Sequence, residues 1–306
     1  MASISRAFAA FLLSISLVAC RDADPVKSEV VATTTAEVTT ATVVVPTPAT
    51  ATYPWKPTAK ERLDVRFAPP VGFSRVAVAE GSFGSFLRTL PLLPPDAKVV
   101  DYRGAPLYDD GHHPNIAAVV DIDVGDKNLQ QCADAVIRMH AEWKYGRGER
   151  DIAYKSVSGT NIPYARYLAG ERAVTRGNDL VLQRSTGPRS DDHALFRSYL
   201  DDVFGVASTR SLDRDAKHVP FTELRAGDFF VMTGQPFGHA VLVLDVAKDE
   251  RGHLALLLGQ SFMPAQSFQV LRPDSRSAWF VVDATTTEIK TPFWPAFSTS
   301  EMTRRL

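Results

Sequence analysis

Two segments of the chain could supply a nucleophile and its base, and the first contains Cys132. In "NLQQCADAVIRMHAEW", residues 128–143, apolar or small side chains recur at helical spacing. Asn128 is expected to cap this helix with Gln131 as its capping-box partner, which places Cys132 in or near the first turn. A helix start can stabilise a thiolate, lower the thiol pKa and donate N–H groups to an oxyanion. Cys132 is therefore a candidate nucleophile, and its own N–H and Gln131 are candidate oxyanion donors. An inert buried cysteine fits the same apolar stripe.

The second segment contains His239. In "AGDFFVMTGQPFGHAVLVLDVA", residues 226–247, a strand is followed by a loop with Gly and Pro, and Gly238 immediately precedes His239. His239 then begins a strand that is apolar on both faces. A histidine at the rim of a buried strand is a candidate general base for Cys132. The alternative is a histidine that bonds a backbone carbonyl at the strand end.

The next strand could supply a residue that orients the histidine. The segments "HAVLVLDVA" (239–247) and "HLALLLGQS" (253–261) flank a short turn, so they should pair as a hairpin. If Asp249 faces Gly252, His239 faces Phe262 and Gln260 is its diagonal neighbour; a two-residue shift would place Gln260 directly opposite. In both registers the Gln260 amide could hold the imidazole in the tautomer that presents its other nitrogen to Cys132.

These segments belong to a chain in which strands dominate the second half. Strands are predicted over 97–102, 115–124, 179–184, 228–233, 239–247, 253–261 and 278–284. Helices are predicted over 81–92, over the Cys132 segment and over 192–208. The pattern indicates an α+β fold in which the Cys132 helix packs on a mostly antiparallel sheet.

The N-terminus resembles an export signal. Arg6 precedes a short apolar run that ends in "LVAC", residues 17–20, which is similar to the lipobox of bacterial lipoproteins. We therefore expect a signal peptide over 1–19, lipidation of Cys20 and attachment to the membrane; the alternative is an ordinary signal peptide. Arg21, in place of Asp, favours the outer membrane, facing the periplasm. If Cys20 is lipidated, Cys132 has no partner in its own chain, which suggests an intermolecular bridge or a free thiol.

The remaining composition bounds the organisation and the ligands. Residues 20–52 are rich in Thr, Ala and Pro and read as a linker after the lipidated cysteine, although "TVVV" could be a strand. Residues 53–306 suffice for a single α+β domain. The formal net charge is −1, with no basic stripe for nucleic acid. "YDDGHHPN" holds two Asp and two His, but adjacent His residues rarely share one ion, so neither a metal nor another cofactor is predicted.

Together, the segments around Cys132 and His239–Gln260 resemble a bacterial family, domain of unknown function 4846. More widely they are similar to papain-like cysteine peptidases of the NlpC type, which cut cell-wall peptides. That resemblance implies a papain-like fold with a cysteine at a helix start, a histidine at a strand start and a polar residue on the next strand. Gln131 and Ala133 depart from the pattern, and residues 151–185 would be an insertion that could line the cleft.

Two functions follow from these expectations. The first is a membrane-anchored periplasmic hydrolase in which Cys132 attacks an amide carbonyl, such as one in a peptidoglycan stem peptide. The second is an inactive lipoprotein of the same fold that binds cell-wall peptide or a protein partner. Thiol labelling discriminates between them, because a nucleophile should react with iodoacetamide at neutral pH faster than a model thiol.

Overall fold

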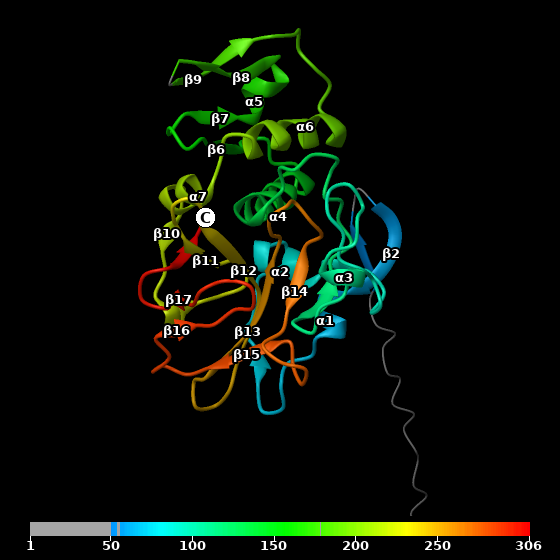
Figure 1. Ribbon diagram of the computed structural model, residues 1–306, viewed down its shortest axis with the longest axis vertical. Coiled ribbons are helices and arrows are strands. Elements are labelled where there is room, and N and C mark those ends of the chain that lie inside the picture. The colour runs from blue at the N-terminus through cyan, green and yellow to red at the C-terminus, as the bar shows by residue number, and fades with distance from the viewer. Residues whose placement is uncertain (1–49, 54–55, 178) are drawn as a thin grey trace, which may run out of the picture. The chain divides into compact units, whose positions relative to one another are not determined.

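The computed structural model describes residues 50–53, 56–177 and 179–306, which belong to one compact unit (Figure 1). The predicted signal peptide, Cys20 and nearly all of the predicted linker lie outside the described residues. None of the helices in the described part of the chain is long and apolar enough to cross a membrane.

The helices and strands alternate irregularly along the chain. The helices are α1 (Leu63–Arg66), α2 (Phe83–Arg88), α3 (Tyr108–Gly111), α4 (Cys132–Gly146), α5 (Tyr164–Leu168), α6 (His193–Phe204), α7 (Thr209–Asp215) and the 3-10 helix η1 (Phe221–Glu223). The strands are β1 (Thr50–Tyr53), β2 (Lys56–Arg62), β3 (Ser74–Arg75), β4 (Pro91–Leu92), β5 (Ile116–Val119), β6 (Ala153–Lys155), β7 (Asn161–Pro163), β8 (Glu171–Arg176), β9 (Asp179–Arg184), β10 (Lys217–His218), β11 (Phe229–Met232), β12 (His239–Lys248), β13 (Leu254–Gln260), β14 (Gln269–Leu271), β15 (Trp279–Val282), β16 (Glu288–Ile289), β17 (Phe297–Ser298) and β18 (Thr303–Arg305).

The main sheet has nine strands, and all its pairings are antiparallel. Its path runs β10-β18-β11-β12-β13-β14-β5, with β15 also paired to β13 and β3 to β12. Four smaller groupings complete the described strands: β1-β2-β4, β6-β7, β8-β9 and β16-β17. The predicted combination of helices with mostly antiparallel sheet is confirmed.

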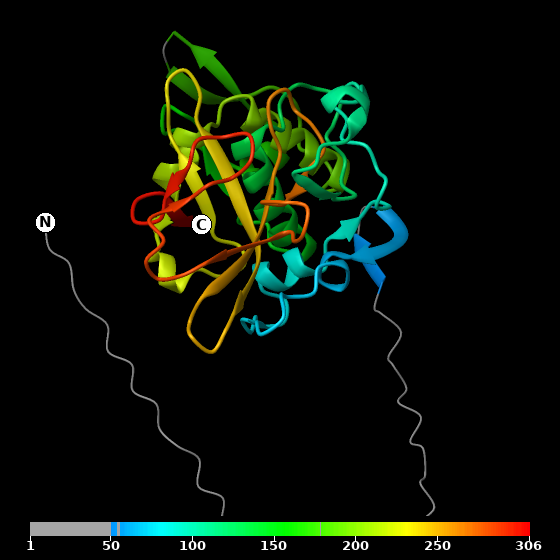
Figure 2. The same ribbon diagram turned by 60° about the horizontal axis from the view of Figure 1, so that its bottom comes forward.

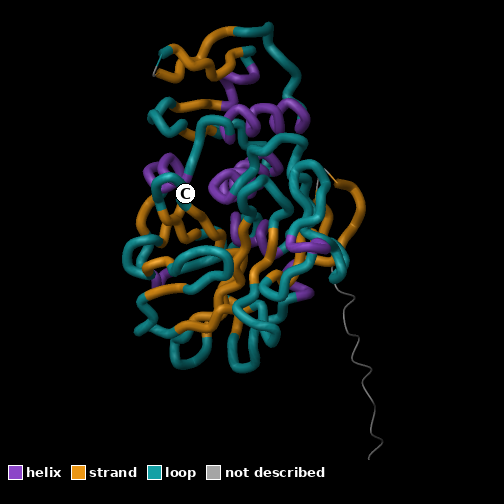
Figure 3. The backbone as a smooth tube through the Cα atoms, in the orientation of Figure 1, coloured by secondary structure: helices purple, strands orange, loops and turns teal. Residues whose placement is uncertain are grey.

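Both faces of the central strands are covered, which is why β12 and β13 are apolar at nearly every position. On one face, Leu242 and Leu244 pack in the cluster that includes Val136 of α4. On the other face, Val241 and Val243 pack with side chains from β11, β13 and the last part of the chain. Figure 2 shows the yellow and orange strands in front of the green helices, and Figure 3 shows α4 beside the sheet in purple.

The predicted β12–β13 hairpin is present, and its register changes along its length. Leu242 faces Gly259 and Val243 faces Leu258, as the predicted alignment requires. A bulge between Val243 and Asp245 then shifts the pairing by one residue, so that Lys248 faces Leu254. The expected pairing of Asp249 with Gly252 is therefore wrong near the turn, while the register is correct toward His239.

Residues 151–185 fold into two hairpins and α5, and they pack away from the start of α4 (Figure 1). Aromatic rings join this group to the far end of α4: the ring centroids of Tyr145 and Phe196 lie 4.2 Å apart, and those of Tyr164 and Phe196 lie 5.2 Å apart. This group of residues therefore supports the C-terminal end of the cysteine helix.

Several predicted elements are shorter than expected. The helix expected over 81–92 is α2, which ends at Arg88, because Pro91 lacks an N–H and begins β4. The helix expected over 192–208 ends at Phe204. The strand expected over 97–102 forms only isolated bridges at Val100 and Asp101.

Candidate functional site

Cys132 is the first residue of α4, and the helix cap differs from the predicted one. Gln131 is the N-cap, and its backbone N–H donates to the Asp134 carboxylate at 3.2 Å. Asn128 instead accepts a hydrogen bond from the Ala265 N–H at 2.8 Å, which ties the preceding loop to the segment after β13. The helix therefore begins later than predicted, and Cys132 lies in its first turn.

A buried arginine fixes the start of α4. Arg138 is fully buried and donates to Glu142 at 2.7 Å, to Gln130 at 2.7 Å and to Asp123 at 2.9 Å. A buried guanidinium needs such partners, because an uncompensated buried charge is strongly destabilising. These bonds connect the middle of α4 to the segment just before Cys132, and they fix where the helix begins.

The Cys132 sulfur lies against the backbone that flanks His239. Its Sγ donates to the carbonyl of Gly238 at 3.8 Å. Successive residues of a strand direct their backbone N–H and C=O groups to opposite edges. Val231 donates its N–H to the Met302 carbonyl, so the backbone groups of the next residue, Met232, point to β12, where Met232 faces His239. The Gly238 carbonyl lies opposite the His239 N–H and therefore points away from β11, toward the edge of β12 that pairs with β13. Strand β13 ends at Gln260, so this edge is not paired beside Gly238. The sulfur occupies this open edge, one peptide unit from His239.

The environment raises the pKa of the Cys132 thiol to about 11, contrary to the expected lowering at a helix start. Burial is the main cause, because it disfavours the charged thiolate, and the Asp134 carboxylate adds to it. The backbone N–H groups of Ala240 and Ala133 act in the opposite direction but do not compensate. In the resting protein the thiol is therefore neutral at pH 7.

This pKa predicts how the thiol reacts with iodoacetamide. At pH 7 Cys132 should be alkylated more slowly than a model thiol, and the rate should rise about tenfold per pH unit up to about pH 11, because only the thiolate reacts. The measurement is the pseudo-first-order alkylation rate by mass spectrometry, with the guanidinium-unfolded protein as the control that should match the model thiol. Faster labelling of the folded protein at pH 7 would contradict the raised pKa.

The structure brings His239 and Gln260 together. Nε2 of His239 lies 2.7 Å from Oε1 of Gln260, and both side chains are buried. Because an amide oxygen can only accept, Nε2 carries the proton and the lone pair is on Nδ1. Nδ1 has no hydrogen-bond partner among the described residues. The imidazole thus has the tautomer that a general base needs.

Aromatic rings enclose the imidazole and keep it neutral. The centroid of the His239 ring lies 5.0 Å from that of Phe262, 4.9 Å from that of Trp294 and 6.2 Å from that of Phe297. Burial lowers the pKa of His239 to about 4, and the hydrogen bond with Gln260 opposes this shift. His239 is therefore uncharged at neutral pH.

Two expected features of the site are not formed. The sulfur of Cys132 bonds the Gly238 carbonyl and not the His239 ring. Helix α4 packs on the face of β12 that carries Leu242 and Leu244, whereas the His239 ring contacts Trp294 and Phe297, which pack on the opposite face with Val241 and Val243. The backbone N–H of Gln131 donates to Leu129 O at 2.7 Å and to the Asp134 carboxylate, so it is not free for an oxyanion. The Gln131 side chain lines the cavity next to Cys132.

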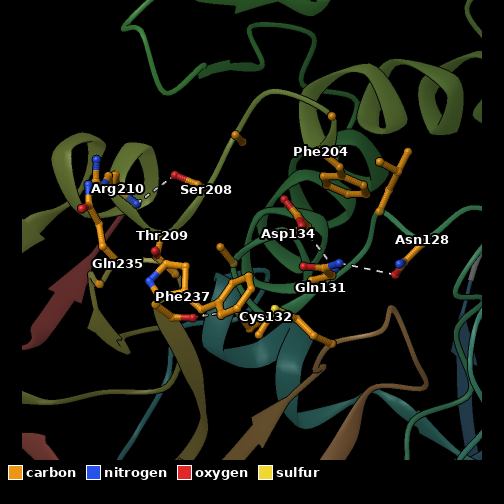
Figure 4. A pocket seen from close by; sticks show the side chains of 18 residues that line it. Asn128, Gln131, Cys132, Asp134, Phe204, Ser208, Thr209, Arg210, Gln235 and Phe237 are labelled. Atoms are coloured by element: carbon orange, nitrogen blue, oxygen red, sulfur yellow. Dashed lines mark hydrogen bonds between the residues drawn. The ribbon is translucent and has the colours of Figure 1, made fainter.

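Cys132 lies in the wall of a cavity of about 810 Å³ (Figure 4). Its walls are the start of α4, the segment from the end of α6 into α7, and the loop between β11 and β12. Its volume lies within the range of about 300–1,000 Å³ that is typical of small-ligand sites. His239 does not reach its surface, and residues 151–185 do not line it.

Sequence reasoning missed Asp134 and the segment that joins α6 to α7. Asp134 could have been noticed as an acid at the third helical position after Gln131, whereas no local signal places Thr209 or Arg210 beside Cys132. His112 and His113, in the stretch considered for a metal, bond Asp96 O and the Asn115 N–H. The described residues contain no group of His, Cys, Asp and Glu suited to a metal ion.

Gly238 allows the close approach of β12 to its neighbours. A Cβ at this position would lie 2.3 Å from Met232 O and 2.4 Å from Thr209 Oγ1. Gly238→Ala should therefore lower the free energy of unfolding by about 1–3 kcal/mol through overpacking. Chemical denaturation measures the loss. Gly146→Ala, on the same helix as Cys132 and with open space around its Cβ, should be neutral or stabilising. Equal unfolding free energies for the two variants would refute the close contact.

The comparisons with known proteins identify the family. The model of the domain of unknown function 4846 matches residues 63–304, so the chain belongs to this family. No curated protein and no solved structure matches the chain.

Proposed function

We propose that this member of the domain of unknown function 4846 family is a membrane-anchored periplasmic hydrolase with a papain-like, NlpC-type arrangement. Its substrate would contain an amide bond, as in peptidoglycan stem peptides. Cys132 is the nucleophile, His239 the base and Gln260 the residue that orients the imidazole. The main support is the position of the sulfur in a cavity wall. It is joined by the His239–Gln260 hydrogen bond, which leaves Nδ1 of the imidazole as a buried acceptor.

The reaction would proceed through an acyl-enzyme. Sγ turns from the Gly238 carbonyl and attacks the substrate carbonyl carbon. Its proton passes to Nδ1 of His239, whose ring would have to turn toward the sulfur from its resting place against Trp294 and Phe297. The backbone N–H of Cys132 donates to the oxyanion. His239 then gives the proton to the leaving amine, the C–N bond breaks and a thioester remains. Water, deprotonated by His239, hydrolyses the thioester to a carboxylic acid and restores the thiol.

The resting protonation states decide how this reaction starts. With thiol and imidazole pKa values of about 11 and about 4, a preformed thiolate–imidazolium pair is strongly disfavoured. Proton transfer would therefore accompany the attack of sulfur on carbon. The assay is digestion of peptidoglycan fragments with the mature protein, with products identified by mass spectrometry as gains of one water that create a new amine and a new carboxyl group.

A second function is favoured by one observation. The sulfur bonds a backbone carbonyl and its pKa is raised, as expected of a thiol that only fills space. In this alternative the chain is an inactive papain-like lipoprotein whose cavity binds cell-wall peptide or a protein partner. Binding of fragments without any hydrolysis in the digestion assay would favour it.

The proposed location predicts the effect of removing the lipid site. Cys20→Ser should move the protein from the membrane fraction to the soluble periplasmic fraction, because no acyl chains can be attached. Fractionation with immunodetection measures this, and mass spectrometry of the N-terminal peptide detects the acyl chains. Cys132→Ser is the matched control and should stay in the membrane fraction. A Cys20→Ser protein that stays membrane-bound would disprove the anchor.

A further inference from the structure

The cavity beside Cys132 contains a buried carboxylate with one unused oxygen. Asp134 is only 7% exposed, and its Oδ2 accepts the backbone N–H of Gln131 at 3.2 Å. Its Oδ1 has no hydrogen-bond partner, although Asp134 lines the cavity. Leaving a buried acceptor unpaired costs about 1–3 kcal/mol, and more for a charged group. A ligand that offers an N–H donor would remove that cost.

The opposite wall contains an unpaired cation. Arg210, near the start of α7, is exposed and makes no ion pair with the described residues. Figure 4 shows Asp134 rising from the start of α4 below the segment that joins α6 to α7, with Arg210 on the other side of the view. Cys132, Asp134 and Arg210 are the ionisable side chains that line the cavity. The walls of the cavity thus present one acidic and one basic side chain together with the thiol.

The geometry points to a short peptide that carries both a free ammonium group, bound by Asp134, and a carboxylate, bound by Arg210. This inference rests on the proposed function, in which the amide between these charged groups reacts with Cys132. The exposed ring of Phe237 and the edge of the buried Phe204 ring, both in the cavity wall, would contact the apolar part of such a ligand. A guanidinium can bind a carboxylate through two parallel hydrogen bonds, so a carboxylate is a suitable ligand group for Arg210.

Binding of an ammonium should also release a proton. Burial raises the pKa of Asp134 to about 8, so near pH 7 the empty cavity holds mainly the protonated acid. A cation beside the carboxylate favours its charged form and lowers this pKa, and the acid then gives up its proton. A neutral donor would leave the acid protonated.

Titration calorimetry with Cys132→Ala tests the inference without hydrolysis. The probes are dipeptides with varied side chains, each as the free zwitterion, the N-acetylated form and the C-terminal amide. We expect zwitterions to bind at least about tenfold more tightly than either blocked form. At pH 7, titrations in two buffers of different ionisation enthalpy should show release of up to one proton by the zwitterion and none by the N-acetylated form.

Charge-removing variants assign the two ends. In the Cys132→Ala background, Asp134→Asn should abolish the discrimination against N-acetylation and the proton release, while its amide oxygen can still accept from Gln131. Arg210→Gln should abolish the discrimination against amidation. Asp179→Asn and Arg251→Gln, both exposed and outside the cavity, are the controls and should change neither.

The outcomes separate the inference from the proposed function. Equal affinity for zwitterionic and blocked probes, or no binding by any probe, would overturn the inference. Zwitterion binding that depends on Asp134 and Arg210 would support it, even if the wild-type protein hydrolysed none of the probes, in which case only the hydrolase proposal would fail.

Discussion

Under the proposed function, Cys132→Ala is expected to lower kcat/KM for the hydrolysis of cell-wall peptides by at least about 10³-fold, because it removes the atom that would form the acyl-enzyme. Within the described residues, Cys132 is the only cysteine, and it lines the cavity. The substitution removes one buried atom beside Gly238, so thermal unfolding should stay cooperative. The measurement is the initial rate of product formation by mass spectrometry.

Two controls make this result specific. Cys132→Ser retains a hydroxyl in the same place but a much weaker nucleophile, and it should be nearly as inactive. Ser211→Ala, a buried hydroxyl in the nearby helix α7, should retain activity if the protein folds. Wild-type rates for Cys132→Ala would show that sulfur takes no part and would favour the binding-protein alternative.

Loss of the base should have the second-largest effect. His239→Gln should lower kcat by about 10²–10⁴-fold, the usual contribution of a positioned general base. A glutamine fills much of the same buried space, so the change should disturb the surrounding aromatic rings less than alanine would. Gln260→Ala should cause a smaller loss, because it leaves the imidazole in place but frees its orientation.

The pH profile identifies the base independently. The pKa of His239 is lowered to about 4, so the imidazole is neutral and able to accept a proton above that pH. The wild-type rate should fall as the pH decreases through about 4, and the residual rate of His239→Gln should lack this limb. A wild-type acidic limb that persists unchanged in His239→Gln would assign it to another group and exclude His239 as the base.

The pairing of His239 with Gln260 could be predicted because it depends on one hairpin. A short turn and two apolar runs limit the register to a few choices, and each of them brings the amide near the imidazole. The bulge at Asp245 could not be predicted, because this buried carboxylate accepts from Arg75 and Arg88, which are far away in sequence. Local pattern determined the hairpin, and distant partners determined its irregularity.

The environment of the thiol was predicted less well for a similar reason. The helix start indicated a lowered pKa, whereas burial under distant segments of the chain raises it. The cap was misplaced because the Asn128 side chain bonds Ala265, 137 residues further along the chain, and not its own helix. Such partners come from tertiary packing, which neither helical periodicity nor capping rules describe.

The neighbours of the sulfur have a consequence for how the protein could diversify. Sγ lies against two main-chain groups, the Gly238 carbonyl and the Ala240 N–H. Substitutions at these two positions keep the main-chain groups, except that proline has no N–H. Most of the cavity walls, in contrast, are loop side chains that can be exchanged singly. Selection, or a saturation library at the exposed Gln235 and Phe237 positions, could therefore change which molecules enter while the sulfur keeps its place. Ligand preference in this fold is separable from the geometry of the thiol.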